Sequence, residues 1–192
     1  MTEKELIAEY RKRNGLETGL NGVSVNGVSE EYLEALLTQR LRSWYSELLA
    51  TGDPAHLPVL DLKEKVQEAR FANGVLTLRL PREGYRLLSV KVPEWPMAVT
   101  RFAASGSYME QLQSDQWLRA TPQTPLVVHD GPWLRLYGVP AATLSTSGGT
   151  ATGQQQAPGL NAALRLEHLM MTAWPEDGSY EFDPADFPTF KL

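Results

Sequence analysis

Histidine is a common metal ligand and general base near neutral pH, and this chain of 192 residues has three of them. His56 lies in a connection flanked by prolines, His129 stands beside Asp130 at the end of an apolar run, and His168 lies within another apolar run. No second His-Asp pair accompanies His129-Asp130, and zinc or iron needs three or four converging ligands. We therefore expect no metal site and assign His129 to a turn.

Other catalytic patterns are also missing from the sequence. Gly148-Gly149 is not followed by the Lys-Ser or Lys-Thr pair of a phosphate-binding loop, and no G-x-S-x-G nucleophile elbow occurs. The acidic residues between Asp177 and Asp183 lack the glycine and glutamate that complete a calcium loop. The absence of cysteine excludes disulfides, thiolate metal sites and a cysteine nucleophile. We expect no catalytic residue, no cofactor and no enzyme; an enzyme whose two carboxylates lie far apart in the sequence is the alternative.

The charge balance is mildly acidic, with 18 basic and 23 acidic side chains and a formal net charge of -5. Such a chain is a poor candidate for wrapping nucleic acid, which calls for a clustered basic surface. The basic residues near Arg11 to Arg13, Arg40 and Arg42 are expected to lie on solvated helix faces rather than on phosphates. Without a signal-peptide pattern or an apolar run of 18 residues, we expect a soluble protein with no membrane partner.

Two helices are predicted at the start of the chain. Thr2 and Glu5 have the spacing of a capping box, and Asn14-Gly15 suits a left-handed exit from the first helix. Ser29 can cap a second helix, which Gly52-Asp53-Pro54 ends. One apolar stripe at steps of three and four residues follows this second helix: Leu33, Leu36, Leu37, Leu41, Trp44 and Leu48. Residues 1–54 therefore form an N-terminal helical segment.

Residues 55–140 are predicted to form a β-rich body. Asp61 to Phe71 is ambiguous, since its composition favours a helix while the Asn73-Gly74 turn after it implies a strand on each side. Alternating apolar runs predict strands at 75–80 and 88–92, and two more at 126–129 and 133–137 around Asp130-Gly131-Pro132.

Segments with little capacity to form a core follow this body. Residues 141–159 consist almost wholly of Ala, Thr, Ser, Gly and Gln and are expected to be a low-complexity loop or arm. Residues 160–192 are expected to hold a returning strand and an acidic tail: 162–171 fits a strand better than a helix, and 179–182 fits a second short strand. This order predicts an α+β chain, with N-terminal helices followed by an antiparallel β-sheet or sandwich with extended loops.

The tryptophans are the best candidates for a binding surface. Trp44 belongs to the helix stripe, whereas Trp95 and Trp117 lie in irregular segments and Trp133 opens a strand. Loop tryptophans are enriched at protein interfaces because they bring a large contact area. We name Trp95, Trp117 and Trp133 as candidate interface residues; an equal alternative is that they plug the ends of a small sandwich.

The middle of the chain shows a family resemblance in the order of its features. Leu80-Pro81 closes a strand, Gly84 to Val92 and Glu94 to Val99 follow, and after a polar insert Gln113 to Val128 precedes Leu134 to Tyr137. This order resembles proteins of Bacteroidetes phages and prophages, including crAss-like phages, which are head–tail connector ring subunits. Their broader relatives are the tail-adaptor proteins beneath the portal of short-tailed phages. The resemblance covers about a third of the chain closely and another third by layout.

The resemblance implies a structural subunit that forms an oligomeric ring between portal and tail around the DNA channel. Its expected partners are copies of itself, the portal and other tail or connector proteins, with DNA passing transiently and without sequence specificity. The protein would be made in the bacterial cytoplasm and end in the neck or tail of the virion. Such relatives finish with a long apolar helix on the N-terminal ones, whereas this chain ends in the acidic segment from Asp183 to Leu192. The alternative function is a soluble β-rich module of a gut bacterium that binds a protein or glycan.

Overall fold

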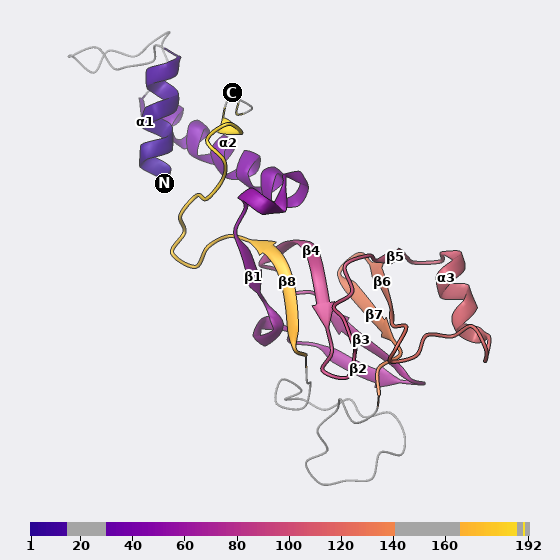
Figure 1. Cartoon of the computed structure of the whole chain (residues 1–192). Coiled ribbons are helices and arrows are strands. Elements are labelled where there is room, and N and C mark those ends of the chain that lie inside the picture. The colour runs from indigo at the N-terminus through magenta and orange to yellow at the C-terminus, as the bar shows by residue number, and fades with distance from the viewer. Residues whose placement is uncertain (15–29, 141–165, 188–189, 191–192) are drawn as a thin grey trace. The chain divides into compact units, whose positions relative to one another are not determined.

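The computed structural model describes residues 1–14, 30–140, 166–187 and 190 (Figure 1). It divides into two compact units: Met1–Val59 with Thr172–Leu192, called here the helical unit, and Leu60–Met171, called the β unit. The α+β class is confirmed, since helices precede two β-sheets. No helix in the described ranges combines the length and the apolarity needed to cross a bilayer.

The helical unit contains α1 (Glu3–Arg13) and α2 (Glu30–Thr51), followed by the single turn η2 (Pro54–His56). The predicted capping box is confirmed: the Thr2 amide donates to the Glu5 carboxylate at 2.8 Å, and the Glu5 amide donates to the Thr2 hydroxyl at 3.3 Å. Asn14 ends α1 with a φ of -98°, outside the left-handed region, and its side chain donates to the Tyr10 carbonyl. The predicted cap at Ser29 lies outside the described residues.

The core of the helical unit is formed by one face of each helix together with the C-terminal segment. The buried face of α2 is turned slightly from the predicted stripe, because Tyr45 and Leu49 are fully buried while Trp44 and Leu48 are only partly so. The buried core residues are Leu6, Ile7, Tyr10, Leu37, Leu41, Tyr45, Leu49, Leu57, Tyr180, Phe187 and Phe190.

The C-terminal segment from Thr172 onward belongs to the helical unit, together with Met1–Val59. The Trp44 ring packs edge-on against Phe182 at 5.2 Å and against Phe187 at 6.0 Å between centroids. The Tyr45 hydroxyl donates to the Glu181 carbonyl and accepts from the Glu181 amide, both at 3.0 Å. The Tyr45 hydroxyl therefore takes the backbone bonds that a neighbouring strand would make. The strand predicted at 179–182 is not present in this described stretch.

The strands form a five-stranded and a three-stranded sheet. The five-stranded sheet has the order β2-β3-β7-β6-β5, and the three-stranded sheet has the order β1-β8-β4. Pairs β2–β3, β3–β7 and β6–β7 are antiparallel as predicted, but β5 runs parallel to β6. The bounds are β1 (Val59–Asp61), β2 (Ala69–Ala72), β3 (Val75–Arg79), β4 (Gly84–Lys91), β5 (Ala103–Ala104), β6 (Leu126–Asp130), β7 (Trp133–Tyr137) and β8 (His168–Ala173).

Both predicted tight turns in the β unit are present. Asn73 and Gly74 have φ of 53° and 76° between β2 and β3, which is the geometry of a two-residue hairpin turn. Gly131 has a φ of 57° between β6 and β7. The ambiguous stretch from Asp61 to Phe71 contains the end of β1, the single turn η3 (Lys63–Lys65) and most of β2, so it is not one helix.

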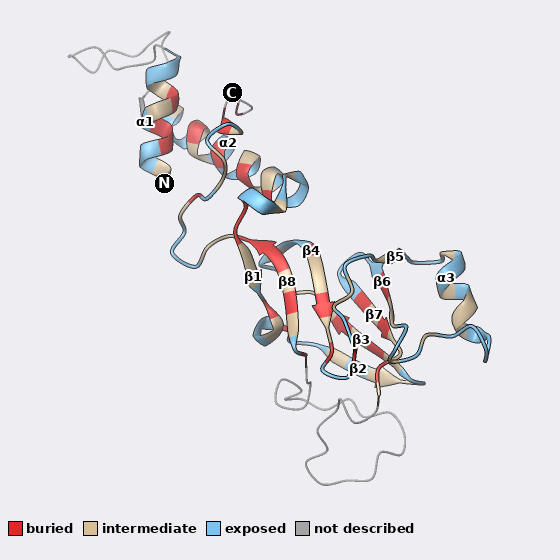
Figure 2. Ribbon diagram, in the orientation of Figure 1, coloured by how far each residue is buried: buried red, intermediate tan, exposed pale blue. Residues whose placement is uncertain are grey.

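The alternating strands bury one face, shown in red on β3, β6 and β7 in Figure 2. Leu76 and Leu78 of β3 pair with Leu136 and Leu134 of β7, and all four are fully buried. β8 begins at His168, which confirms a strand at the described end of 162–171. Residues 141–159, predicted to be a loop or arm, lie outside the described part of the chain.

Candidate interaction surface

Trp95 belongs to the interior, so its assignment to an interface was wrong. Its side chain is only 2% exposed, and its indole N–H donates to the Gly138 carbonyl at 3.0 Å. The Trp95 amide also donates to the Val92 carbonyl at 3.0 Å, so the backbone makes a tight turn at this residue. A buried indole with a satisfied N–H stabilises the β unit and offers nothing to a partner.

Trp133 opens β7 and is 37% exposed. It pairs with Arg79 of β3, whose guanidinium carbon lies 5.8 Å from the centre of the indole ring. Glu68 holds the same guanidinium through an ion pair of 2.7 Å. This stacking orders the Arg79 side chain and covers part of the indole, so Trp133 is only partly exposed to solvent.

Trp117 is the most exposed of the three candidates, with 89% of its surface open to solvent. It lies in a short excursion formed by α3 (Tyr108–Gln111), the single turn η4 (Leu112–Ser114) and the turn after it. We call Tyr108–Leu118 the apolar loop, because four large apolar side chains in it are exposed: Tyr108, Met109, Trp117 and Leu118. Figure 1 shows α3 beside β5 and β6, on the side of the β unit away from β1 and β8.

Polar contacts fix the start of the apolar loop to the sheet. The Glu110 carboxylate pairs with the Arg135 guanidinium at 2.6 Å and accepts a hydrogen bond of 3.0 Å from the Tyr137 hydroxyl. The same carboxylate accepts from the Gly106 amide at 2.7 Å, and the Gln111 side chain donates to the Gly106 carbonyl at 3.1 Å. Burial, followed by the bond to Glu110, raises the pKa of Tyr137. The loop is therefore tied to β7 by a charge-assisted network.

Side chains also determine the conformation of the turn that carries Trp117. One carboxylate oxygen of Asp115 accepts hydrogen bonds from the amides of Trp117 at 2.7 Å and of Leu118 at 3.3 Å. Gln113 accepts from the Ala120 amide at 2.7 Å and donates to the Met109 carbonyl at 2.9 Å. An exposed indole on a turn ordered in this way loses little further conformational entropy on binding.

The three histidines lie in separate surroundings. His56 faces Asp183 at 3.5 Å within the helical unit, and His168 lies 3.3 Å from the Ser89 hydroxyl on neighbouring strands. His129, near the end of β6, is exposed. Among the residues that the structure describes, no group of three or more His, Asp or Glu side chains has the arrangement of a metal site.

The sequence indicated part of this surface and missed part. The sequence indicates Trp117 as a candidate, but Tyr108 and Met109 lie in the polar insert, for which it predicts no contact surface. Two apolar pairs, 108–109 and 117–118, stand in otherwise polar sequence with Leu112 as the one large apolar residue between them, and this pattern is the signal that could have identified them. Together they form a surface suited to protein contact, because large exposed aromatic and Met side chains are enriched at interfaces.

No protein-family model matches this chain, and no curated protein matches it.

Proposed function

We propose that this chain is a structural, non-enzymatic subunit of a phage head–tail connector, and that it forms an oligomeric ring between portal and tail around the DNA channel. The observation that carries the proposal is the apolar loop, in which Trp117 stands 89% exposed on a turn that Asp115 and Gln113 order. A rigid, exposed tryptophan is the usual anchor of a protein–protein interface. An assembly subunit is the kind of protein that needs such an anchor.

Two further features support this role. The sequence from Leu80 to Tyr137, which resembles connector ring subunits, includes the apolar loop and the strands that anchor it. The net charge of -5 suits a channel that DNA passes through without being gripped.

Assembly is the direct test. The purified full-length chain should form rings, alone or on the portal protein encoded beside it, when examined by electron microscopy and by mass measurement in solution. A chain that stays monomeric at high concentration, binds no portal and has no phage genes around its own would overturn the proposal.

A second candidate, a soluble module of a gut bacterium that binds a protein or glycan, is favoured by the Trp133 ring stacked on Arg79. Since Trp95 is buried, such a module would use Trp117 or Trp133. A glycan screen with the wild-type chain and with Trp133→Ala separates the candidates: glycan binding lost in Trp133→Ala supports the module, whereas ring formation without glycan binding supports the connector.

A further inference from the structure

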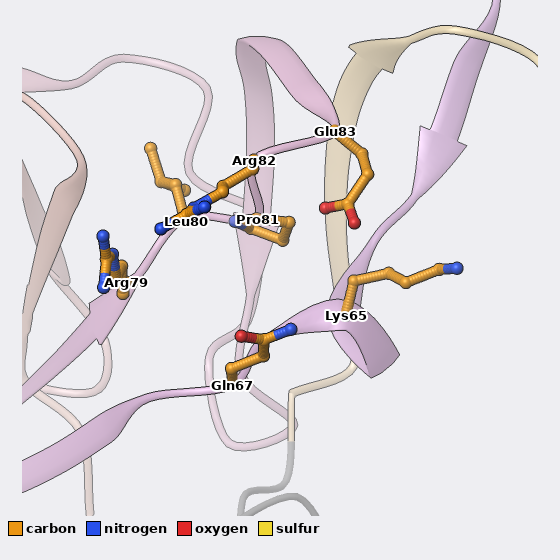
Figure 3. A pocket seen from close by; sticks show the side chains of 7 residues that line it. All are labelled: Lys65, Gln67, Arg79, Leu80, Pro81, Arg82 and Glu83. Atoms are coloured by element: carbon orange, nitrogen blue, oxygen red, sulfur yellow. The ribbon is translucent and has the colours of Figure 1, made fainter.

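The β unit has a pocket at the link between β3 and β4, shown in Figure 3, with a volume of about 230 Å³. Its lining comes from the end of η3, the link from η3 to β2, the end of β3 and the link from β3 to β4: Lys65, Gln67, Arg79, Leu80, Pro81, Arg82 and Glu83. Pockets for drug-sized ligands usually measure roughly 300–1,000 Å³, so this one has the size for a single large side chain.

The lining combines an apolar surface with positive charge. Pro81 is buried and Leu80 half-buried, while Lys65, Arg79 and Arg82 outnumber the one lining carboxylate, Glu83. Arg79 is held in place by Glu68 and by the Trp133 ring. Proline, leucine and guanidinium groups are good contacts for the face of an indole. Since Glu68 already pairs with Arg79, the exposed Arg82 is the positive charge that favours a carboxylate next to the indole.

The apolar loop has the complementary chemistry. Trp117 is the exposed indole, and the exposed carboxylate of Asp115 lies two residues before it in the same turn. The Trp117 amide is bonded to that carboxylate, which keeps the acidic group close to the base of the indole.

The two surfaces are built from different parts of the sheet. The pocket adjoins β2 and β3, whereas the apolar loop follows β5 at the other end of the order β2-β3-β7-β6-β5 and is bonded to β7 through Glu110. A contact that joins unlike surfaces of two copies is head-to-tail, and repetition gives a closed ring or an open filament.

We propose that Trp117 of one copy inserts into the β3–β4 pocket of a second copy, with Asp115 facing Arg82. This inference rests on the proposed ring assembly and names one contact within it. It predicts that each copy contributes its apolar loop to one neighbour and its pocket to the other.

Disulfide trapping tests the contact directly, because the chain has no cysteine of its own. Gln116→Cys places a thiol beside Trp117, and Glu83→Cys places one at the pocket. Under mild oxidation, a mixture of the two variants should give a cross-linked dimer containing one copy of each, while either variant alone should give none. Met97→Cys, at a side chain that is exposed outside both surfaces, is the control and should not cross-link with either. No mixed dimer, or equal yields in all mixtures, would overturn the contact.

Complementation of two defective variants gives a second test that does not use thiols. Trp117→Ala removes the inserted side chain and Arg82→Glu reverses the pocket's charge, and each should weaken self-association about tenfold or more. Both positions are exposed, so both variants should fold. Each variant alone should self-associate less than the mixture at every concentration, and an equimolar mixture at high concentration should give dimers and nothing larger, since one intact contact remains. Met97→Ala should assemble like wild type.

The results of these experiments distinguish the Trp117–pocket contact from the proposed ring assembly. Rings that are unchanged in Trp117→Ala would overturn this contact and leave the connector proposal standing. Filaments or dimers that depend on Trp117 would support the contact and overturn the closed ring. A wild-type chain that neither assembles nor gives the mixed cross-link would overturn the contact, and assembly on the portal would then decide the connector proposal.

Discussion

Gly138 and Gly74 form a matched pair that separates backbone strain from steric clash. Gly138 follows β7 with a φ of 75°, and Gly74 lies in the β2–β3 turn with a φ of 76°. A Cβ on Gly138 would meet the backbone of Thr121, with the carbonyl carbon at 2.7 Å and the Cα at 3.2 Å. A Cβ on Gly74 would meet nothing within 4 Å. The two sites thus share a conformation and differ in their surroundings.

The expected costs follow from this difference. Left-handed backbone costs a residue with a Cβ about 1–2 kcal/mol, which is the whole effect expected for Gly74→Ala. Gly138→Ala adds the clash with rigid backbone, about 1–3 kcal/mol for an overpacked site. It also disturbs the hydrogen bond from Trp95 to the Gly138 carbonyl, worth about 1 kcal/mol. The free energy of unfolding should therefore fall by about 3–6 kcal/mol in Gly138→Ala.

Denaturant unfolding followed by tryptophan fluorescence measures both costs, because Trp95 is buried beside Gly138 and its emission should change when the β unit unfolds. Gly138→Ala should shift the midpoint at least twice as far as Gly74→Ala. Since Thr121 follows the apolar loop, amide exchange at the end of that loop should also quicken in Gly138→Ala alone. Equal midpoint shifts in the two variants would refute the steric argument.

Three further predictions concern other contacts. Asp115→Ala should speed hydrogen exchange of the Trp117 and Leu118 amides about fivefold, as expected for the loss of roughly 1 kcal/mol. Asp115→Asn keeps an acceptor oxygen and should change the exchange rates less. Equal rates in both variants would contradict the role of Asp115. The hydrogen bond from Arg42 lowers the pKa of Glu3, so its contribution is present above about pH 4.5 and lost as the pH falls through the lowered value; an acid titration of unfolding should show this loss in wild type and not in Glu3→Gln. Burial raises the pKa of Tyr45 to about 12, so the helical unit should lose stability between about pH 10 and 12. Burial also raises the pKa of Tyr180, so Tyr45→Phe should lose less stability than wild type over this range, and an equal loss would contradict the assignment to Tyr45.

The parts of the fold that sequence predicted well are those decided by neighbouring residues. The Thr2–Glu5 capping box forms within one turn of helix, and the Asn73-Gly74 turn is set by two backbone angles. The hairpin at 126–137 combines a glycine turn with two alternating strands. Such local signals require no knowledge of what packs against them.

The predictions that failed depended on contacts between distant residues. Ser179 to Phe182 alternates like a strand, yet Tyr45, far away in sequence, bonds the backbone of Glu181 and takes the place of a neighbouring strand. The same limit applies to the candidate interface. In the sequence, both Trp95 and Trp117 look like tryptophans of a loop. Trp95 is shown to be interior by its burial and by its hydrogen bond to Gly138, which lies far from it in the sequence.

The energy available from the apolar loop indicates how the proposed ring would be held together. Burying one fully exposed large apolar side chain contributes about 1.5–3 kcal/mol. The four in the loop are 51–89% exposed, so they supply roughly 4–8 kcal/mol when a neighbour covers them. Association of two copies costs an estimated 4–15 kcal/mol. A single head-to-tail contact is therefore close to balance, and two isolated copies should pair weakly. Ring closure changes this balance, because each subunit is then held on both sides and the last contact forms within one assembly. The portal, by binding several copies at once, would favour closure in the same way.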